Sequence, residues 1–283
     1  MFSSKIAIFA YACLALVLLV IVGRPILQTM LRATLRVRTD GKAPLTWRDR
    51  IMLRYQDQDM DIWMFARFKT RLDPMFAELR EFLKATPDVR TILDLGCGYG
   101  FAGSFLLDHF GHAEIYAVEP NRARVRGAAR AFGDRGHVFH IAAPDFESPG
   151  LPERFDAVFI LDVVHFLSDS GLDLTLRRAR ARLDEGKTLF LRVPLKPVGF
   201  GSVIFNMDRI SRAVTGSFAT FRSVEHIRDA IIGAGFTLVR SQMSGANPEL
   251  YWFIATASVV MEEHRPVMQP MVALAEEENQ DQD

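Results

Sequence analysis

The stretch from Thr91 to Gly100 constrains the fold of this chain more than any other part of the sequence. It begins with the run Thr-Ile-Leu-Asp-Leu and ends in three glycines that alternate with Cys97 and Tyr99. Apolar residues at helical spacing follow between 101 and 110. A strand, a glycine turn and a helix in this order bring a bound cofactor against the open end of a parallel sheet. Glycine suits such a turn because a Cβ would block close approach of the backbone.

From residue 90 onward the sequence alternates regularly between predicted strands and helices. Strands are expected near 91–95, 114–118, 137–142, 156–161 and 188–193, and helices near 100–110, 121–132 and 172–184. A later helix begins after Ser223 and ends before Gly235, and two final strands follow. The connection between these two strands is short, which predicts antiparallel pairing. The pattern as a whole predicts an α/β fold with a mostly parallel, doubly wound sheet.

The N-terminus carries an uninterrupted apolar run from Ile6 to Val22, without a charge, a proline or a glycine. Its length is at the short end of what spans a bilayer. The basic residues are concentrated after the run, which places the C-terminal bulk on the cytoplasmic side. We therefore expect residues 1–23 to be a single-pass transmembrane anchor. A cleaved signal peptide is the main alternative, but Gly23-Arg24-Pro25 is a poor context for cleavage, and a buried helix of a soluble protein is a more distant one.

Residues 24–85 carry helical patterning of two kinds. The first part has apolar residues at helical spacing among arginines. This predicts a basic juxtamembrane helix that lies along the membrane surface, or alternatively packs on the domain. The second part predicts amphipathic helices with a break and restart at Asp73 and Pro74. These helices either cap the pocket or pack as ordinary amphipathic helices on the sheet.

Charge and cysteine content narrow the function. Lys+Arg and Asp+Glu both number 34, so the formal net charge is zero and nothing global points to a nucleic-acid partner. The two cysteines, Cys13 and Cys97, show no metal-ligand spacing, so we expect neither a disulfide nor a metal site. Residues 261–283 are rich in acidic side chains, which predicts a disordered tail.

Glu119 ends the second predicted strand, about twenty positions after the glycine turn. An acidic residue at this distance commonly binds ribose hydroxyls. A carboxylate suits this task because it can accept two hydrogen bonds from a vicinal diol. The alternative is a solvated carboxylate at the end of a strand.

Four segments together resemble the class I S-adenosylmethionine-dependent methyltransferases. The stretch Asp94–Gly100 is similar to their first motif, and Val118-Glu119-Pro120 is similar to the second. Ala143-Pro-Asp145-Phe146 resembles the segment that contacts adenine, and residues 155–167 resemble the fourth strand and its loop. The resemblance covers roughly 75–258. It implies S-adenosylmethionine as cofactor, a methyltransferase domain at 86–260, and strand order 3-2-1-4-5-7-6 with strand 7 antiparallel.

The resemblance also implies roles for individual residues. Asp94 would order the amino end of the cofactor, Glu119 would hold the ribose, and Asp145 would accept the adenine amino group. Leu161 and Asp162 would lie near the sulfonium. Tyr55, an aromatic residue in the helices before the first strand, is a further candidate. The predicted cofactor-binding residues are therefore Tyr55, Asp94, Gly96, Cys97, Gly98, Glu119, Pro120, Asp145, Phe146, Leu161 and Asp162.

The predicted function is a membrane-anchored methyltransferase that acts on a small apolar, aromatic or lipid-linked acceptor, with O-methylation favoured. His165 is the candidate base, because its ordinary pKa lies near operating pH. It could instead be a loop histidine that only shapes the pocket. Two other functions are a non-catalytic interaction module of the same fold at the membrane and a nicotinamide-dependent oxidoreductase. The oxidoreductase fits poorly because Phe101 stands where its glycine motif needs glycine or alanine. The sequence does not specify an oligomeric state.

Overall fold

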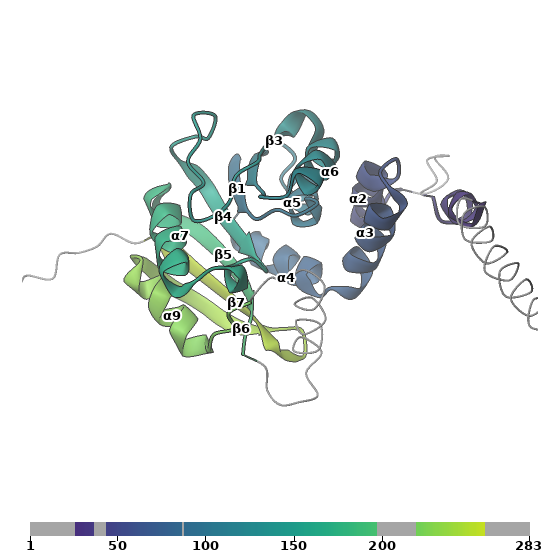
Figure 1. Cartoon of the computed structure of the whole chain (residues 1–283). Helices are drawn as coiled ribbons and strands as arrows, with labels where there is room; N and C mark the ends of the chain where they lie inside the picture. Colours follow the sequence, from purple (N-terminus) through teal and green to yellow (C-terminus); the bar gives the residue numbers. More distant parts are fainter. Residues whose placement is uncertain (1–25, 37–43, 87, 197–218, 258–283) are drawn as a thin grey trace, which may run out of the picture.

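The computed structural model describes residues 26–36, 44–86, 88–196 and 219–257. Its centre is a seven-stranded sheet in the order β3-β2-β1-β4-β5-β7-β6 (Figure 1). The strands are β1 Thr91–Leu95, β2 Glu114–Val118, β3 Gly136–Phe139, β4 Phe155–Leu161, β5 Leu183–Pro194, β6 Phe236–Ser244 and β7 Asn247–Ala257. β1 to β5 pair in parallel, whereas β7 is antiparallel to both β5 and β6. The predicted strand order and the antiparallel seventh strand are confirmed.

Helices cover both faces of this sheet. They are α2 Trp47–Tyr55, α3 Met60–Leu72, α4 Met75–Phe82, α5 Phe101–His109, α6 Arg122–Phe132, α7 Asp169–Ala181 and α9 Val224–Gly233, with the short 3₁₀ helices η1 Leu83–Ala85, η2 Gly133–Arg135 and η3 Val164–Phe166. Successive strand residues point to opposite faces. Ile92 accordingly packs with the buried side chains of α2 to α6, whereas Leu93 packs with those of α7 and α9. The sheet therefore separates two hydrophobic cores.

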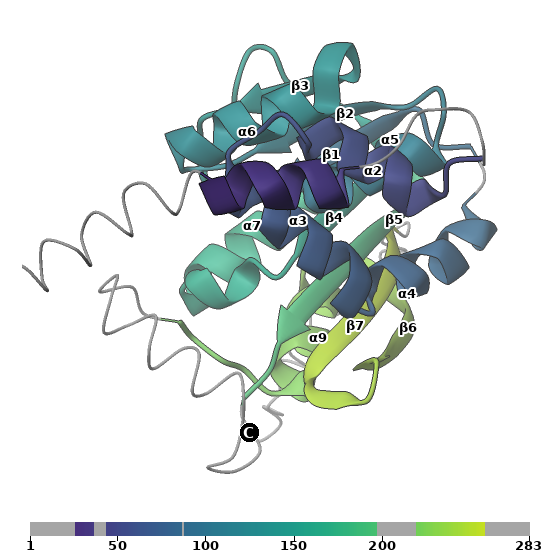
Figure 2. The ribbon, with the colours of Figure 1, turned by 90° about the vertical axis from the view of Figure 1, so that its right-hand side faces the viewer.

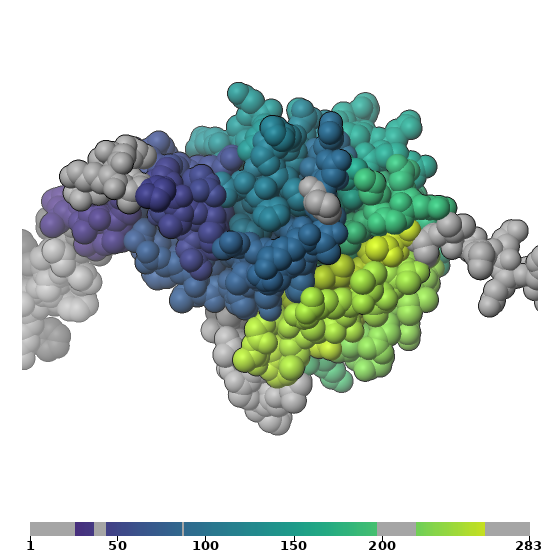
Figure 3. All heavy atoms as spheres, turned by 180° about the vertical axis from the view of Figure 1, so that it is seen from behind, coloured from purple at the N-terminus to yellow at the C-terminus, as the bar shows by residue number. Residues whose placement is uncertain are grey.

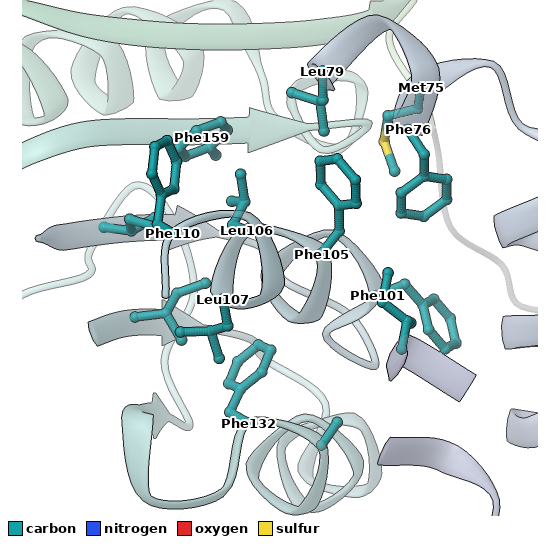
Figure 4. Packing of buried hydrophobic residues seen from close by; sticks show 14 of the residues in the cluster. Met75, Phe76, Leu79, Phe101, Phe105, Leu106, Leu107, Phe110, Phe132 and Phe159 are labelled. Atoms are coloured by element: carbon teal, nitrogen blue, oxygen red, sulfur yellow. The ribbon is translucent and has the colours of Figure 1, made fainter. Parts of the chain in front are cut away.

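Helix α5 is the centre of the first core. Phe105 points toward α4, where its ring meets Phe76 edge-on with the ring centroids 5.5 Å apart (Figure 4). Leu107 points to the opposite side, toward Phe132 of α6. The helix that follows the glycine turn is thus fixed from both sides, which fixes the position of the turn itself.

Helix α4 is attached to the far edge of the sheet through one carboxylate. Glu78 accepts hydrogen bonds from the Ser244 hydroxyl at 2.7 Å, the Gly245 amide at 2.6 Å and the Trp252 indole at 2.7 Å. The space-filling view from behind shows the blue α4 region in contact with the yellow-green hairpin of β6 and β7 (Figure 3). Three donors to one carboxylate hold the cap helices against the sheet.

Several element boundaries differ from those expected. β3 ends at Phe139 rather than near 142, and as an edge strand it pairs only with β2. α7 begins at Asp169 rather than near 172, because the Ser168 hydroxyl caps it by accepting from the Gly171 amide. The expected break at Asp73 is confirmed, and the Asp73 carboxylate accepts from the Met75 amide at 2.9 Å as the next helix begins. Ser223 caps α9 as expected.

The N-terminal part of the described chain is a helix over residues 26–35. Figure 2 shows it lying across the outer side of α2 and α3. Arg32 donates to the Gln56 carbonyl at 3.3 Å, and Leu35 packs against the first core. Within the described ranges no helix is long and apolar enough to cross a membrane. The predicted anchor at 6–22 and the predicted tail at 261–283 both lie outside the described residues.

Candidate active site

The glycine turn leaves the carboxyl end of β1 and wraps around the end of β2. The amides of Gly96 and Cys97 both donate to the Val118 carbonyl, at 2.8 and 3.1 Å. Gly96, Gly98 and Gly100 all have positive φ angles, 77°, 58° and 81°. A side chain at Gly96 would meet Val163 at 2.4 Å, whereas a Cβ at Gly98 would have no atom within 4 Å. The turn therefore packs tightly at its base and opens onto free space at Gly98.

Glu119 lies beneath this open position. Its side chain is buried, and its two oxygens accept from the Gly98 amide at 3.0 Å and the Asn121 amide at 2.9 Å. The guanidinium of Arg124 lies 4.0 Å from the same carboxylate. Glu119 thus joins the glycine turn to the start of α6 at the edge of the free space.

Asp94 is the second buried carboxylate of the turn. Only 2% of it is exposed, and one of its oxygens, Oδ2, has no hydrogen-bond partner. Burial, together with the smaller effect of the nearby Glu119 carboxylate, raises the pKa of Asp94 to about 7. A buried carboxylate without a donor is suited to receive one from a ligand, and a cationic amino group would favour its charged form.

Two glycine substitutions should separate packing from ligand binding. We expect Gly98→Ala to cost about 1–2 kcal/mol of stability because of its positive φ, and to weaken S-adenosylhomocysteine binding by at least about tenfold, about 1.4 kcal/mol, because its Cβ enters the free space. Gly96→Ala should cost more stability, because its Cβ also collides with Val163. Denaturant unfolding and ligand titration measure both effects. Gly186→Ala is the matched control, since Gly186 also has positive φ and open space. Equal affinity of Gly98→Ala and Gly186→Ala for S-adenosylhomocysteine would contradict the placement of the ligand in the free space at Gly98.

The raised pKa of Asp94 predicts a pH-dependent gain in stability for Asp94→Asn. The folded protein holds the proton up to about pH 7, whereas the unfolded chain releases it near its ordinary value of 3.8. Charging Asp94 therefore destabilises the free protein increasingly from pH 4 to 7 and fully above 7. Asp94→Asn should be more stable than wild type by roughly a few kcal/mol at pH 8, with the difference small at pH 4.

Thermal unfolding at the two pH values measures this difference, and ligand titration should show weaker S-adenosylhomocysteine binding by the same variant. Asp156→Asn is a control of opposite sign. Burial of Asp156 would raise its pKa, but hydrogen bonds from Lys187 and two backbone amides hold that pKa below its ordinary value. Asp156→Asn should therefore lose stability at pH 8. A loss of stability at pH 8 in Asp94→Asn would disprove the claim that the charged form of Asp94 destabilises the free protein.

Residues 143–146, the segment expected to contact adenine, lie partly on the surface and partly in the core. Asp145 is 81% exposed and its carboxylate pairs with Arg178 at 2.6 Å, whereas Phe146 is fully buried. The carbonyl oxygen of Pro120 lies 2.7 Å from His140 Nε2. The contacts of Asp145, Phe146 and Pro120 with adenine remain predictions.

The carboxyl end of β4 lies next to the glycine turn. Asp162, directly after Leu161, is a non-glycine residue with positive φ, 58°, in the described part of the chain. Such a conformation is tolerated by Asp and often occurs at functional sites. Val163 packs on Gly96. His165 follows in η3, and its ring centroid lies 4.0 Å from that of Phe166. The structure thus brings Asp94, Gly96, Glu119 and Asp162 together around one edge of the sheet, and their contacts with a cofactor remain predictions.

An ion cluster at the same edge was not predicted. Arg192 of β5 is 2% exposed and forms a two-pronged ion pair with Asp73, at 2.9 and 3.1 Å. It also lies 3.4 Å from Asp162, and Lys69 of α3 lies 3.0 Å from Asp73 and 3.8 Å from Asp162. Burial would raise the pKa of Asp73, but Arg192 and Lys69 lower it, and the result is a pKa below the ordinary value. The one signal in the sequence is a lone arginine inside an apolar strand.

Tyr55 and Cys97, both predicted to contact the cofactor, lie in largely buried surroundings. Tyr55 is fully buried; its hydroxyl donates to the Tyr99 carbonyl at 3.0 Å and lies 2.9 Å from the Ser104 hydroxyl. Burial raises the pKa of the Cys97 thiol, which keeps it neutral. Tyr55 supports the turn from behind, and its contact with the cofactor remains a prediction.

Comparisons with known proteins agree with this geometry. Residues 92–186 match the family model described as a methyltransferase domain. Malonyl-[acyl-carrier protein] O-methyltransferase of Legionella pneumophila subsp. pneumophila (strain Philadelphia 1) is 30% identical over 107 residues, which is 38% of this chain and 37% of the relative. The chain therefore matches little more than a third of the length of that curated relative.

Many solved structures share the fold, among them two bacterial methyltransferases. A S-adenosylmethionine-dependent methyltransferase from Mesorhizobium loti aligns with a TM-score of 0.52 at 17% identity, covering 66% of this chain and 99% of that one. Another from Clostridium acetobutylicum ATCC 824 aligns with a TM-score of 0.50 at 13% identity, covering 69% and 98%.

Residues 92–186 match the methyltransferase family, and the glycine turn within them and the strand order around them are those of a class I S-adenosylmethionine-dependent methyltransferase domain. The cofactor of this class is S-adenosylmethionine, and the residues present fit it. Gly98 faces free space, and Asp94, four residues earlier in the chain, has a buried carboxylate oxygen without a hydrogen-bond partner.

Proposed function

We propose that the protein transfers a methyl group from S-adenosylmethionine to an oxygen atom of a small apolar, aromatic or lipid-linked acceptor. The observation that carries this proposal is the pair of buried carboxylates at the open glycine turn: Asp94 in the strand that leads into the turn, and Glu119, which accepts from the Gly98 amide. In this arrangement Asp94 binds the amino group of the cofactor and Glu119 binds the ribose hydroxyls. S-adenosylmethionine supplies an activated methyl group on a sulfonium, so the protein mainly contributes alignment.

The end of β4 supplies the residues near the reacting atoms. Leu161 and Asp162 lie at the carboxyl end of β4, the next residue, Val163, lies against Gly96 of the turn, and His165 follows two residues later. An oxygen nucleophile must lose its proton, and a histidine is suited to accept it near neutral pH. We assign this role to His165. The O-methyltransferase activity in the name of the Legionella relative supports oxygen as the methylated atom.

The apolar side of α3 supports an apolar acceptor. Phe65, Phe68 and Leu72 are 52%, 53% and 76% exposed, and their spacing places them along one side of the helix. One end of this stripe is beside the glycine turn, where the ring centroids of Phe65 and Phe101 are 5.3 Å apart. Lys69, on the adjoining side of the helix, reaches Asp162. The stripe therefore begins beside the glycine turn and adjoins Lys69, which reaches the end of β4, and its apolar side chains suit an aromatic or aliphatic group.

We further propose that residues 6–22 anchor the protein in a membrane as a single pass, with the catalytic domain on the cytoplasmic side. The apolar run and the basic residues after it support this orientation. Ile26, Leu27 and Met30, a few residues after the run, are each more than half exposed. A lipid-linked acceptor would then be presented in the same surface layer as the enzyme.

Isotope transfer tests the proposed reaction. The full chain in detergent is incubated with S-adenosylmethionine that carries a trideuteromethyl group, together with an organic extract of membranes from the source cells. We expect the label in an apolar product detected by mass spectrometry, with formation of S-adenosylhomocysteine in equal amount. S-adenosylhomocysteine binding without any label transfer would instead favour the non-catalytic module.

A further inference from the structure

The turn that carries His165 is held by a segment from a distant part of the sequence. The Thr220 amide donates to the His165 carbonyl at 2.7 Å. The Phe221 ring lies parallel to the His165 ring, with 6.0 Å between centroids and 5° between planes. The carbonyl of Arg222 in turn accepts from the Lys196 amide at 3.0 Å. Residues 220–222 are therefore fixed between η3 and the end of β5.

Arg222 makes the largest number of bonds in this contact. It is only 5% exposed, yet its guanidinium donates to the Val164 carbonyl at 3.0 Å and the Leu167 carbonyl at 2.6 Å. It also donates to the Thr220 carbonyl at 3.3 Å and to the Asp169 carboxylate at 2.7 Å. The two bonded carbonyls of Val164 and Leu167 lie on either side of His165 in the chain.

We infer that Arg222 is a positioning residue that fixes the Val164–Leu167 turn and, through it, the side chain of His165. The planar guanidinium is suited to this because it presents several donors in a rigid fork, and Asp169 balances its buried charge. A lysine has one compact ammonium group and cannot reach all four acceptors in the same geometry. Backbone carbonyls of a short 3₁₀ turn otherwise need water or another partner.

The catalytic importance of this clamp rests on the proposed function, in which His165 takes the acceptor proton. The claim that Arg222 fixes the position of His165 does not depend on that function. Arg222 touches neither the donor nor the acceptor in this assignment, so its effect on catalysis is indirect. Loss of the clamp should lower the rate of methyl transfer and leave donor binding unchanged.

Chemical modification tests the positioning directly. Full-length wild type, Arg222→Gln and Arg222→Lys are treated with diethyl pyrocarbonate, and modification of the His165 peptide is followed by mass spectrometry. We expect His165 to react several times faster in Arg222→Gln and at an intermediate rate in Arg222→Lys. Arg135→Gln is the matched control, because Arg135 also donates to backbone carbonyls, those of Leu107, Phe110 and Gly111, at the end of α5. The other histidine peptides report any general loosening of the fold.

The same variants are then compared in label transfer and in S-adenosylhomocysteine titration. Arg222→Gln should lower the turnover rate by about tenfold to a hundredfold, as expected for a misplaced group, with ligand affinity unchanged. Should Arg222→Gln fail to fold, Asp169→Asn removes the charge partner of Arg222 and should give the same pattern in weaker form. An unchanged His165 modification rate in Arg222→Gln, or in Asp169→Asn if Arg222→Gln does not fold, overturns the positioning role.

Faster modification with undiminished label transfer overturns the link to catalysis. Absence of label transfer in the wild type contradicts the proposed function alone, because the modification rates still report on the placement of His165.

Discussion

Replacement of Glu119 by alanine is expected to lower the affinity for S-adenosylhomocysteine by about two to four orders of magnitude. The carboxylate is buried beside the free space at Gly98, where it can accept two hydrogen bonds from a ribose diol. Each hydrogen bond to a charged group contributes about 1.5–3 kcal/mol, and the variant loses both. The variant also leaves the amides of Gly98 and Asn121 without their acceptor, which loosens the turn. Isothermal titration of wild type and variant measures the change.

Two further variants make this result specific. Glu119→Gln keeps an acceptor oxygen but loses the charge, so its affinity should lie between those of wild type and Glu119→Ala. Glu153→Ala, at an exposed position in the loop before β4, should bind like wild type. An affinity of Glu119→Ala within about twofold of wild type, a difference below about 0.5 kcal/mol, would exclude Glu119 as a cofactor ligand.

Replacement of Arg192 by alanine is expected to destabilise the fold by about 3–5 kcal/mol. The side chain is almost completely buried, and its removal leaves Asp73 and Asp162 close together with only Lys69 to balance them. Denaturant unfolding measures the loss. Arg154→Ala is the surface control, since its pair with Asp184 is more than half exposed on both sides and should contribute less than about 1 kcal/mol.

The destabilisation in Arg192→Ala should also depend on pH. In the wild type the pKa of Asp73 is held below its ordinary value, so its contribution to stability is complete above the unfolded pKa and is lost as the pH falls through the folded pKa. Without Arg192, Asp73 keeps only Lys69 as a cationic partner at neutral pH, and in acid the Asp73 carboxylate is neutral. The difference between variant and wild type should therefore shrink toward acid pH. A constant difference would show that lost packing, rather than lost charge balance, causes the destabilisation.

The sheet, and the meeting of the proposed donor-site residues at one edge of it, could be predicted because their signals are local. A strand, a glycine turn and a helix are adjacent in the chain, and Glu119 follows at a fixed distance along the next strand. Parallel neighbours then bring Asp94 and Glu119 to the same edge without further information. Ser223 and Asp73 were recognised for the same reason, as local signals of helix ends.

The ion cluster at Arg192 and the contacts of Arg222 could not be predicted in the same way, because they join residues far apart in the sequence. Arg192 meets Asp73 from a position 119 residues away, and Arg222 meets Val164 across 58 residues. Tyr55 was noticed as an aromatic residue, but its position behind the turn depends on how α2 packs on α5. Periodicity shows that such helices exist and does not show which partner their polar residues find.

The most direct test of the donor site is titration of the full chain in detergent with S-adenosylhomocysteine, with NAD titrated in parallel. We predict saturable binding of S-adenosylhomocysteine at one site, in competition with S-adenosylmethionine, and no binding of NAD. Absence of S-adenosylhomocysteine binding at millimolar concentration, or binding of NAD in its place, would contradict the assignment of Asp94, Gly98 and Glu119 as a methyl-donor site.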